Sequence, residues 1–234
     1  MNDPFYKKLK SPELDDAIND LENLSEEVKH EYNVLLTKYD TNDLQHKILL
    51  MLLARVCKYF DAYLLLIKEG YGEPGSNLIR SIFESILWMR WIIISEDNAQ
   101  KYFDLSKGEL IRIALTNIGN GYFKPKNVPD TEAFKSLLKD ESQNYKLPNW
   151  TELAKTTNMM KHYNLFYKYL ATISHGTFMF LGERIVDLKI SPDPDDKNIL
   201  PFIVLANNFT RDCMLVTKIW ILENKIREIP LIKL

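Results

Sequence analysis

The sequence contains little glycine and lacks several short motifs that mark large enzyme classes. Only 8 of its 234 residues are glycine, which argues against a protein built from glycine-rich βαβ turns and favours long helices. The phosphate-binding GxxxxGKS/T loop, the metal-binding HExxH motif and the GxSxG nucleophile turn are all missing. Enzymes that depend on these motifs are therefore excluded.

Cysteine and histidine are also scarce, and neither is arranged as a metal site. The two cysteines, Cys57 and Cys213, lie far apart in apolar segments and form no CxxC pair. We predict buried, reduced thiols, with a disulfide as the alternative. No cluster of cysteine and histidine has zinc spacing, so we predict neither a metal ion nor another cofactor.

An excess of one charge and a long hydrophobic run are missing too. The 30 basic and 32 acidic residues give a net charge of −2. Extended nucleic-acid binding therefore has no compositional support, although a local basic groove stays open. The N-terminal segment has no apolar stretch of a signal peptide, and no apolar run reaches the roughly 20 residues that span a bilayer. We expect a cytoplasmic protein with no membrane partner.

Helical periodicity fills most of the chain instead. It predicts an all-α fold, a bundle of about seven to eight mostly antiparallel helices without a strand, in a single domain over residues 1–234. The expected helices are 12–39, 44–69, 73–95, 98–118, 130–144, a short helix from 150, 158–188 and 201–228. Asp43 is expected to cap the second, and Asn149 and Glu152 have the spacing of a capping box. The periodicity of 158–188 places Tyr167 on the core face. Residues 1–11 are expected to be a lead-in, and 117–129 and 189–200 are expected to be loops.

The most hydrophobic stretch, residues 73–95, carries a polar stripe. Arg80 and Glu84 are four residues apart, so on a helix their side chains can pair. The rest of the stripe consists of Asn77, Ser81, Ser85 and Trp88. Small serines permit a neighbouring helix to approach closely. The stripe is therefore either an ion pair that fixes helix packing or one wall of a polar pocket.

A second polar group lies in the segment from residue 158 to 188. His175 follows Ser174 directly and comes six residues after Tyr169. Histidine can act as a general acid or base, arginine can stabilise an anion, and glutamate can orient either one. Arg80, Glu84 and His175 are thus candidate catalytic residues. The alternative is that His175 is a hydrogen-bonded structural residue of a packed helix.

Three segments carry a family resemblance. They are GYGEPGSNLIRSIFESILWMRWI (70–92), KYFDLSKGE (101–109) and YKYLATISHG (167–176). In this order they resemble an uncharacterised bacterial family of all-helical domains, over roughly residues 58–181. The resemblance implies a shared site at Arg80, Glu84, Tyr102, Ser174 and His175, but no named reaction. The candidate binding residues are Asn77, Trp88, Tyr102, Tyr169 and Ser174.

More remotely, the helical architecture resembles HEPN-type domains, many of which are metal-independent ribonucleases in toxin and phage-defence systems. That resemblance implies an arginine followed a few residues later by a histidine, in a domain that acts as a dimer. The chain departs from the pattern, because no histidine follows Arg184 or Arg211 and no arginine precedes His175 on its own helix. Such chemistry would need Arg80 from another helix or another subunit.

Two functional hypotheses remain, and the sequence does not decide whether the protein is an enzyme. The first is a non-catalytic module that binds a partner protein or a small ligand, in which Arg80 and Glu84 hold the architecture. The second is a ribonuclease or phosphoesterase of a toxin or defence system, with His175 as acid or base and Arg80 on the phosphate of an RNA. A homodimer is compatible with either.

Overall fold

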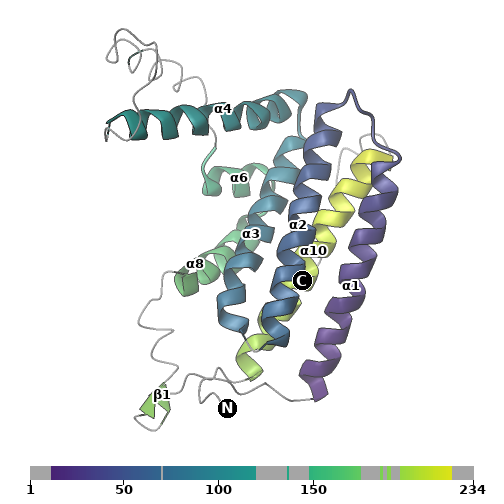
Figure 1. The fold of residues 1–234 in the computed structure, drawn as a ribbon, viewed down its shortest axis with the longest axis vertical. Coiled ribbons are helices and arrows are strands. Elements are labelled where there is room, and N and C mark those ends of the chain that lie inside the picture. Colours follow the sequence, from purple (N-terminus) through teal and green to yellow (C-terminus); the bar gives the residue numbers. More distant parts are fainter. Residues whose placement is uncertain are drawn as a thin grey trace.

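Four long helices form the core of the computed structural model. The structure describes residues 12–69, 71–119, 136, 148–174, 185–186, 189–190 and 196–222. The core helices are α1 (Pro12–Leu36), α2 (Leu44–Lys68), α3 (Gly72–Ile92) and α10 (Asp196–Leu222) (Figure 1). α1 and α3 each pack against both α2 and α10. This arrangement confirms the predicted all-α bundle.

α2 begins where capping chemistry predicts. Asp43 is the N-cap of α2 and its carboxylate accepts a hydrogen bond from the His46 backbone N–H at 3.1 Å. The connection between α2 and α3 is short, and the two helices run antiparallel (Figure 1). Cys57 and Cys213 are free thiols, as predicted, although Cys57 is only partly buried. Among the described segments, no helix combines the length and the apolar character that crossing a bilayer requires.

α4 (Glu96–Gly119) leaves the end of α3 and projects from the bundle (Figure 1). The Ser95 hydroxyl accepts from the Asn98 N–H at 3.1 Å, which fixes its start. The helix runs three residues into the loop predicted from 117, since it ends only at Gly119. The next described helix is α6 (Trp150–Thr156). Its predicted capping box is confirmed, because the Asn149 side chain and the Glu152 side chain each bind the other residue's backbone N–H.

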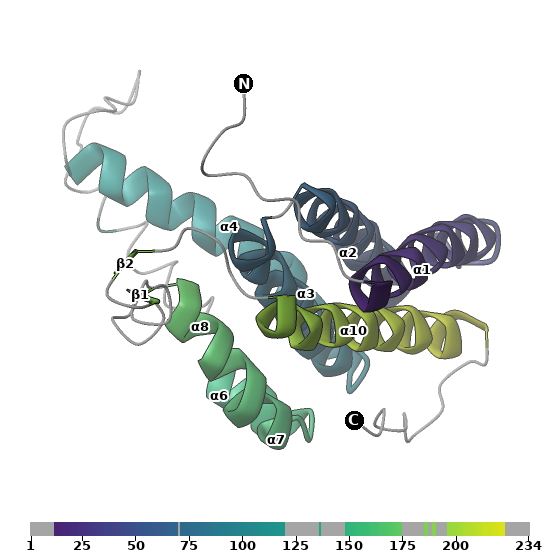
Figure 2. The same cartoon turned by 90° about the horizontal axis from the view of Figure 1, so that it is seen from below.

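A second helical rod packs on the outer side of α3. It consists of α7 (Met160–His162), the π-helix η1 (Tyr163–Tyr167) and α8 (Lys168–Ser174), which follow one another without a break (Figure 2). Asn158 has a φ of 58°, a left-handed conformation that asparagine tolerates better than most residues. This turn lets the chain reverse between α6 and α7.

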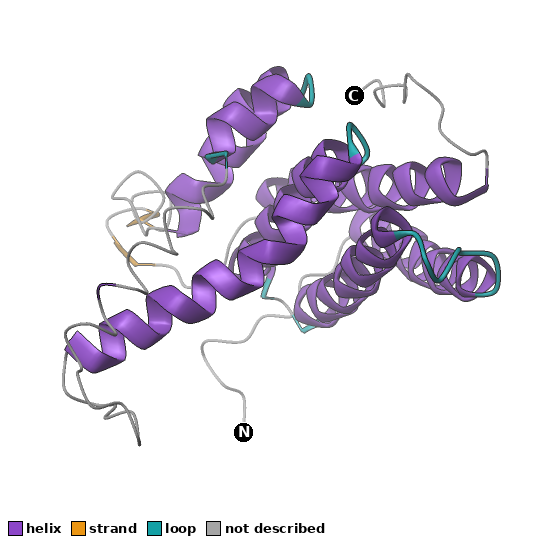
Figure 3. Ribbon diagram, turned by 90° about the horizontal axis from the view of Figure 1, so that it is seen from above, coloured by secondary structure: helices purple, strands orange, loops and turns teal. Residues whose placement is uncertain are grey.

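Two expectations for the C-terminal half were wrong. Residues 185–186 and 189–190 form a small antiparallel pair, β1 (Ile185–Val186) and β2 (Lys189–Ile190), instead of the end of a helix and the start of a loop (Figure 3). Their β-branched residues favour extended backbone. α10 begins at Asp196, five residues before the predicted start at Pro201. Pro201 therefore lies inside the helix. The predicted helix 130–144 and lead-in 1–11 lie outside the described residues, except for residue 136, which is helical.

A glycine sets the distance between α2 and α3. Gly70, Gly72 and Gly75 have the GxGxxG spacing of dinucleotide-binding proteins, but here the segment joins two helices instead of following a strand. At Gly75 the constraint is packing: a Cβ atom would lie 2.7 Å from Cδ2 and 2.9 Å from Cε2 of Tyr63. Tyr63 is fully buried, so its ring has little room to move.

We expect Gly75→Ala to lower the free energy of unfolding by about 1–3 kcal/mol, because the new methyl group overpacks the α2–α3 contact. The neighbouring Ser76→Ala is the matched control. The Ser76 hydroxyl is buried without a hydrogen-bond partner among the described residues, so its removal sacrifices no bond. Urea unfolding measures both. A Gly75→Ala protein as stable as wild type would contradict the packing argument.

Candidate functional site

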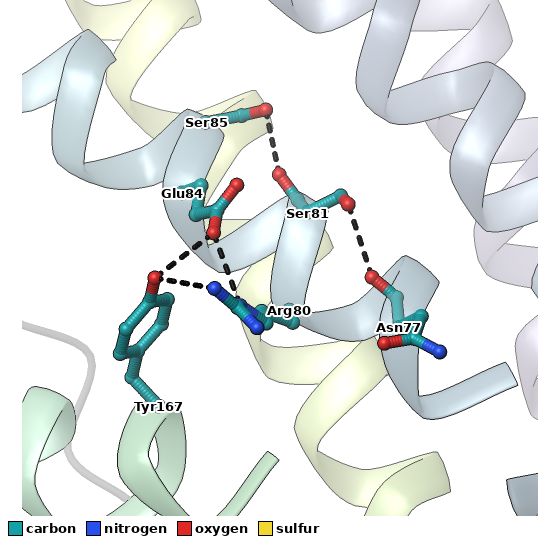
Figure 4. Close-up of polar contacts among 6 residues, drawn as sticks. All are labelled: Asn77, Arg80, Ser81, Glu84, Ser85 and Tyr167. Atoms are coloured by element: carbon teal, nitrogen blue, oxygen red, sulfur yellow. Dashed lines mark hydrogen bonds and ion pairs between the residues drawn. The ribbon is translucent and has the colours of Figure 1, made fainter. Parts of the chain in front are cut away.

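Arg80, Glu84 and Tyr167 form a closed ring of hydrogen bonds, the Arg80–Glu84–Tyr167 triad (Figure 4). Arg80 Nε donates to Glu84 Oε1 at 3.1 Å, and Arg80 Nη2 donates to the Tyr167 hydroxyl at 2.9 Å. That hydroxyl donates to the same Glu84 oxygen at 3.1 Å. The side chains of Arg80 and Glu84 are 24% and 22% exposed, so the triad sits at the edge of the α3–η1 contact.

The π-helix supplies the third member of the triad. Tyr167 is the last residue of η1, and its ring stacks on that of Tyr163, with centroids 5.0 Å apart and planes 18° apart. The Arg80 guanidinium carbon lies 4.8 Å from the centre of the Tyr167 ring, within the range of a cation–π contact. Single π-helical turns are frequent at functional sites. The local backbone therefore presents the tyrosine to Arg80 through both its ring and its hydroxyl.

The protonation states follow from burial and from mutual attraction. Burial raises the pKa of Tyr167 to about 12, and the charge of Glu84 adds to this while Arg80 opposes it. Burial lowers the pKa of Arg80, but Tyr167 and Glu84 outweigh burial and the net shift is upward. At neutral pH the triad thus holds a cationic guanidinium and a neutral phenol, which can donate to Glu84 while it accepts from Arg80.

Aromatic side chains extend from the triad along four helical elements. We define the aromatic strip as Tyr102, Trp88, Trp150 and Tyr163, all partly exposed. Trp88 of α3 lies 5.1 Å from Tyr102 of α4 and 5.8 Å from Trp150 of α6, measured between ring centroids. Trp150 in turn lies 5.9 Å from Tyr167. Burial raises the pKa of Tyr102, with Arg55 on α2 opposing the shift. The strip joins α4, α3, α6 and η1 into one surface.

The structure brings some candidate residues together and separates others. Trp88 and Tyr102 are in contact with each other and join the triad through Trp150. Asn77 lies at the exposed end of the stripe, where its backbone carbonyl accepts from the Ser81 hydroxyl (Figure 4). Tyr169 is 45% exposed and stacks on Phe202 of α10. His175 and the side chain of Ser174 lie outside the described residues, so their meeting with Arg80 remains a prediction.

Sequence reasoning missed the role of Tyr167. Its periodicity indicated a core position, and the residue is indeed only 5% exposed. A buried tyrosine needs a partner for its hydroxyl, however, and the nearest polar stripe on an apolar helix was that of Arg80 and Glu84. The need of the buried Tyr167 hydroxyl for a hydrogen-bond partner was thus the sequence signal for a contact with this stripe. The pairing itself spans 87 residues, which local spacing does not reveal.

A second polar contact, between α3 and α10, was also missed. Arg90 donates to both carboxylate oxygens of Asp212, at 2.6 and 3.1 Å, and their side chains are only 6% and 5% exposed. Burial lowers the pKa of the nearby His162, although the charge of Asp212 opposes the shift. Each partner lies in a largely apolar stretch of its helix, and that was the sequence signal. Their burial indicates a role in fixing the α3–α10 geometry.

The described residues offer little to a metal ion. Glu27 and His30 have the Glu-x-x-His spacing of di-iron bundles, but His30 is exposed and Glu27 accepts from Arg211 at 3.0 Å. Within the described part of the chain, no group of three or more histidine, cysteine, aspartate or glutamate side chains could hold a metal.

We expect Arg90→Met to lower the free energy of unfolding by about 3–5 kcal/mol, because it leaves the Asp212 carboxylate buried without its partner. The double variant Arg90→Met/Asp212→Leu should recover most of this loss, since neither charge then remains. Lys101→Met is the control: it breaks an exposed pair with Asp97 and should change stability by about 0.5 kcal/mol or less. Chemical unfolding distinguishes these outcomes. A double variant no more stable than Arg90→Met would count against this account.

The raised pKa of Tyr167 predicts a loss of stability in alkali. Above its ordinary pKa of 10.0 the phenol ionises in the unfolded chain while it stays protonated in the folded one up to about 12, so the unfolded state loses its proton first and stability falls between these values. Tyr167→Phe should lower the unfolding free energy by about 1–2 kcal/mol at pH 8 and then decline less steeply above pH 10. Tyr32→Phe removes a phenol outside the triad as a control. Identical pH slopes in Tyr167→Phe and wild type would refute the prediction.

Comparison with known proteins adds one match. No curated protein and no solved structure matches the chain. The model of a family described as "Family of unknown function (DUF5677)" matches residues 46–191, more than half of the chain. The matched span begins in α2 and includes α3, the triad and the aromatic strip. The prediction of an uncharacterised family is thereby confirmed: the chain belongs to DUF5677, a family of unknown function.

Proposed function

We propose that the chain is a non-catalytic helical binding module in which the Arg80–Glu84–Tyr167 triad holds the architecture. The closure of the triad carries this proposal. Two of the three guanidinium nitrogens of Arg80 are engaged by Glu84 and Tyr167, and the phenol both donates and accepts. A catalytic acid, base or anion-binding group needs an open position for the reacting atom. Here each of the three side chains binds the other two, which favours a clasp between α3 and η1.

The aromatic strip supports the binding part of the proposal. Tryptophan, tyrosine and arginine are enriched at the energetically important positions of protein interfaces. The strip combines partly exposed rings that hold one another in place with the cation of Arg80 beside it. Such a surface suits a partner protein, and a second copy of the chain is one such partner. We assign the strip as the surface of contact.

The proposal predicts no metal-independent cleavage of RNA by the purified protein, and a structural effect when Arg80 is removed. Arg80→Ala leaves Glu84 and Tyr167 without their shared partner, so the melting temperature should fall by about 2–6 °C. Arg55→Ala is the matched control, because Arg55 is exposed and bonds only locally, to Tyr59 at 2.8 Å. Its melting temperature should stay near that of wild type.

The same samples test the ribonuclease alternative. Single-stranded RNA is incubated without metal ions with wild type, Arg80→Ala and His175→Ala, and the products are separated on a gel. Cleavage by wild type that disappears in both variants, while both melt like wild type, would overturn the proposal and establish an enzyme. Intact RNA together with a destabilised Arg80→Ala protein supports the module.

A further inference from the structure

A groove between α1 and α2 lies apart from the triad. It has a volume of about 700 Å³ and is lined by side chains of these two helices and by Tyr39, which follows α1. Four of the lining residues are aliphatic: Leu36, Leu50, Met51 and Ala54. Met51 is 72% exposed and Leu36 is 40% exposed. Large aliphatic side chains grouped in an open groove and left to water are a feature of surfaces that receive another molecule.

Three cations border this α1–α2 groove, and none of its lining residues is acidic. Lys47, Arg55 and Lys58 are exposed, and no salt bridge within the described residues includes them. Some other cations of the bundle are paired, as Lys68 is with Glu22 and Lys218 with Glu31. The groove thus carries three positive charges with no ion-pair partner among the described residues. These charges favour a negatively charged occupant.

The spacing of the cations indicates an elongated occupant. Lys47, Met51, Arg55 and Lys58 follow one face of α2, and eleven residues of helix span about 16 Å. Tyr32 of α1 and Tyr39, in the connection after α1, also line the groove. A single small anion cannot reach both ends of such a row. A helix laid along the groove can, with acidic residues at about the same spacing as the cations.

The aliphatic residues that line the groove distinguish a peptide from a nucleic acid as its occupant. A helix can present leucine-like side chains to Leu36 and Met51, whereas nucleobases stack on flat aromatic faces and need a continuous basic track. Methionine adapts its shape to such partners. The overall charge of −2 also disfavours a polyanion. Charge and shape together therefore favour an amphipathic helix with an acidic border.

We propose that the α1–α2 groove docks an acidic amphipathic helix of a partner protein, with its aliphatic face on Leu36 and Met51 and its carboxylates on Lys47, Arg55 and Lys58. This inference rests on the proposed function of a binding module and adds the class of partner.

Two synthetic helical peptides test the proposal with the full chain. The first has leucine at helical spacing with glutamate on both flanks, and the second replaces each glutamate by lysine. Fluorescence anisotropy of the labelled peptides measures their affinity. The acidic peptide should bind at least about tenfold more tightly than the basic one, as expected for the gain of one or more charge-assisted contacts. Raising the salt concentration should weaken it.

Charge reversal sharpens the test. Lys47→Glu/Lys58→Glu should exchange the preference, so that the basic peptide binds better, while Lys155→Glu, at an exposed lysine of α6, should leave it unchanged. All of these positions are exposed, and melting temperatures check the fold. Met51→Ser should weaken the acidic peptide without reversing the preference.

Three results would overturn the proposal: no binding of the acidic peptide, equal affinity for both peptides, or binding of a single-stranded RNA that depends on Lys47 and Lys58. The first two would leave the non-catalytic role of the triad intact, because the groove variants do not touch Arg80, Glu84 or Tyr167. RNA cleavage, conversely, would refute the proposed function through the triad variants alone. The two failures are therefore distinguishable.

Discussion

The burial of α3 is the constraint on which the rest of the structure depends. This helix packs against α2, α10, α8, α4 and α6, so nearly every other described element takes its position from it. Its apolar residues, among them Ile79, Ile82 and Phe83, have no exposed surface. Close contact with α2 is allowed because position 75 carries no Cβ atom against the Tyr63 ring. Hydrophobic burial drives this assembly, and the polar contacts then select one geometry within it.

Two arginines on α3 illustrate two uses of charge in an apolar helix. Arg90 is almost completely buried and faces Asp212 of α10, so its pair trades a large desolvation penalty for a fixed geometry. Arg80 is partly exposed and faces Tyr167 of η1, where water screens part of the interaction. The first contact belongs to the core, and the second belongs to the edge where the aromatic strip begins. The Arg80–Tyr167 contact is the one that can form part of a functional surface, because it is partly exposed.

The features that could be predicted from the sequence were those that depend only on residues close together along the chain. The caps at Asp43 and Asn149 and the pairing of Arg80 with Glu84 are all contacts within four residues, and they formed as expected. The partners Tyr167 and Asp212 lie 87 and 122 residues from the arginines that they bind. No periodicity specifies such pairs, because they depend on how the helices pack. The antiparallel pair of β1 and β2 was not predicted for a related reason, because strands of two residues are too short to show the alternation of side chains by which a strand is recognised in a sequence.

The π-helix η1 makes the length of its segment as important as its composition. Its hydrogen bonds span five residues instead of four, so the segment accommodates about one residue more than an α-helix over the same arc. Loss of a single residue from η1 would therefore convert it to an ordinary α-helical turn and leave α8 in nearly the same register. Gain of a residue would instead turn α8 by about 100° relative to α7. Among relatives of this chain, the spacing between Asn158 and Tyr167 should accordingly be the same as here or one residue shorter, but not longer.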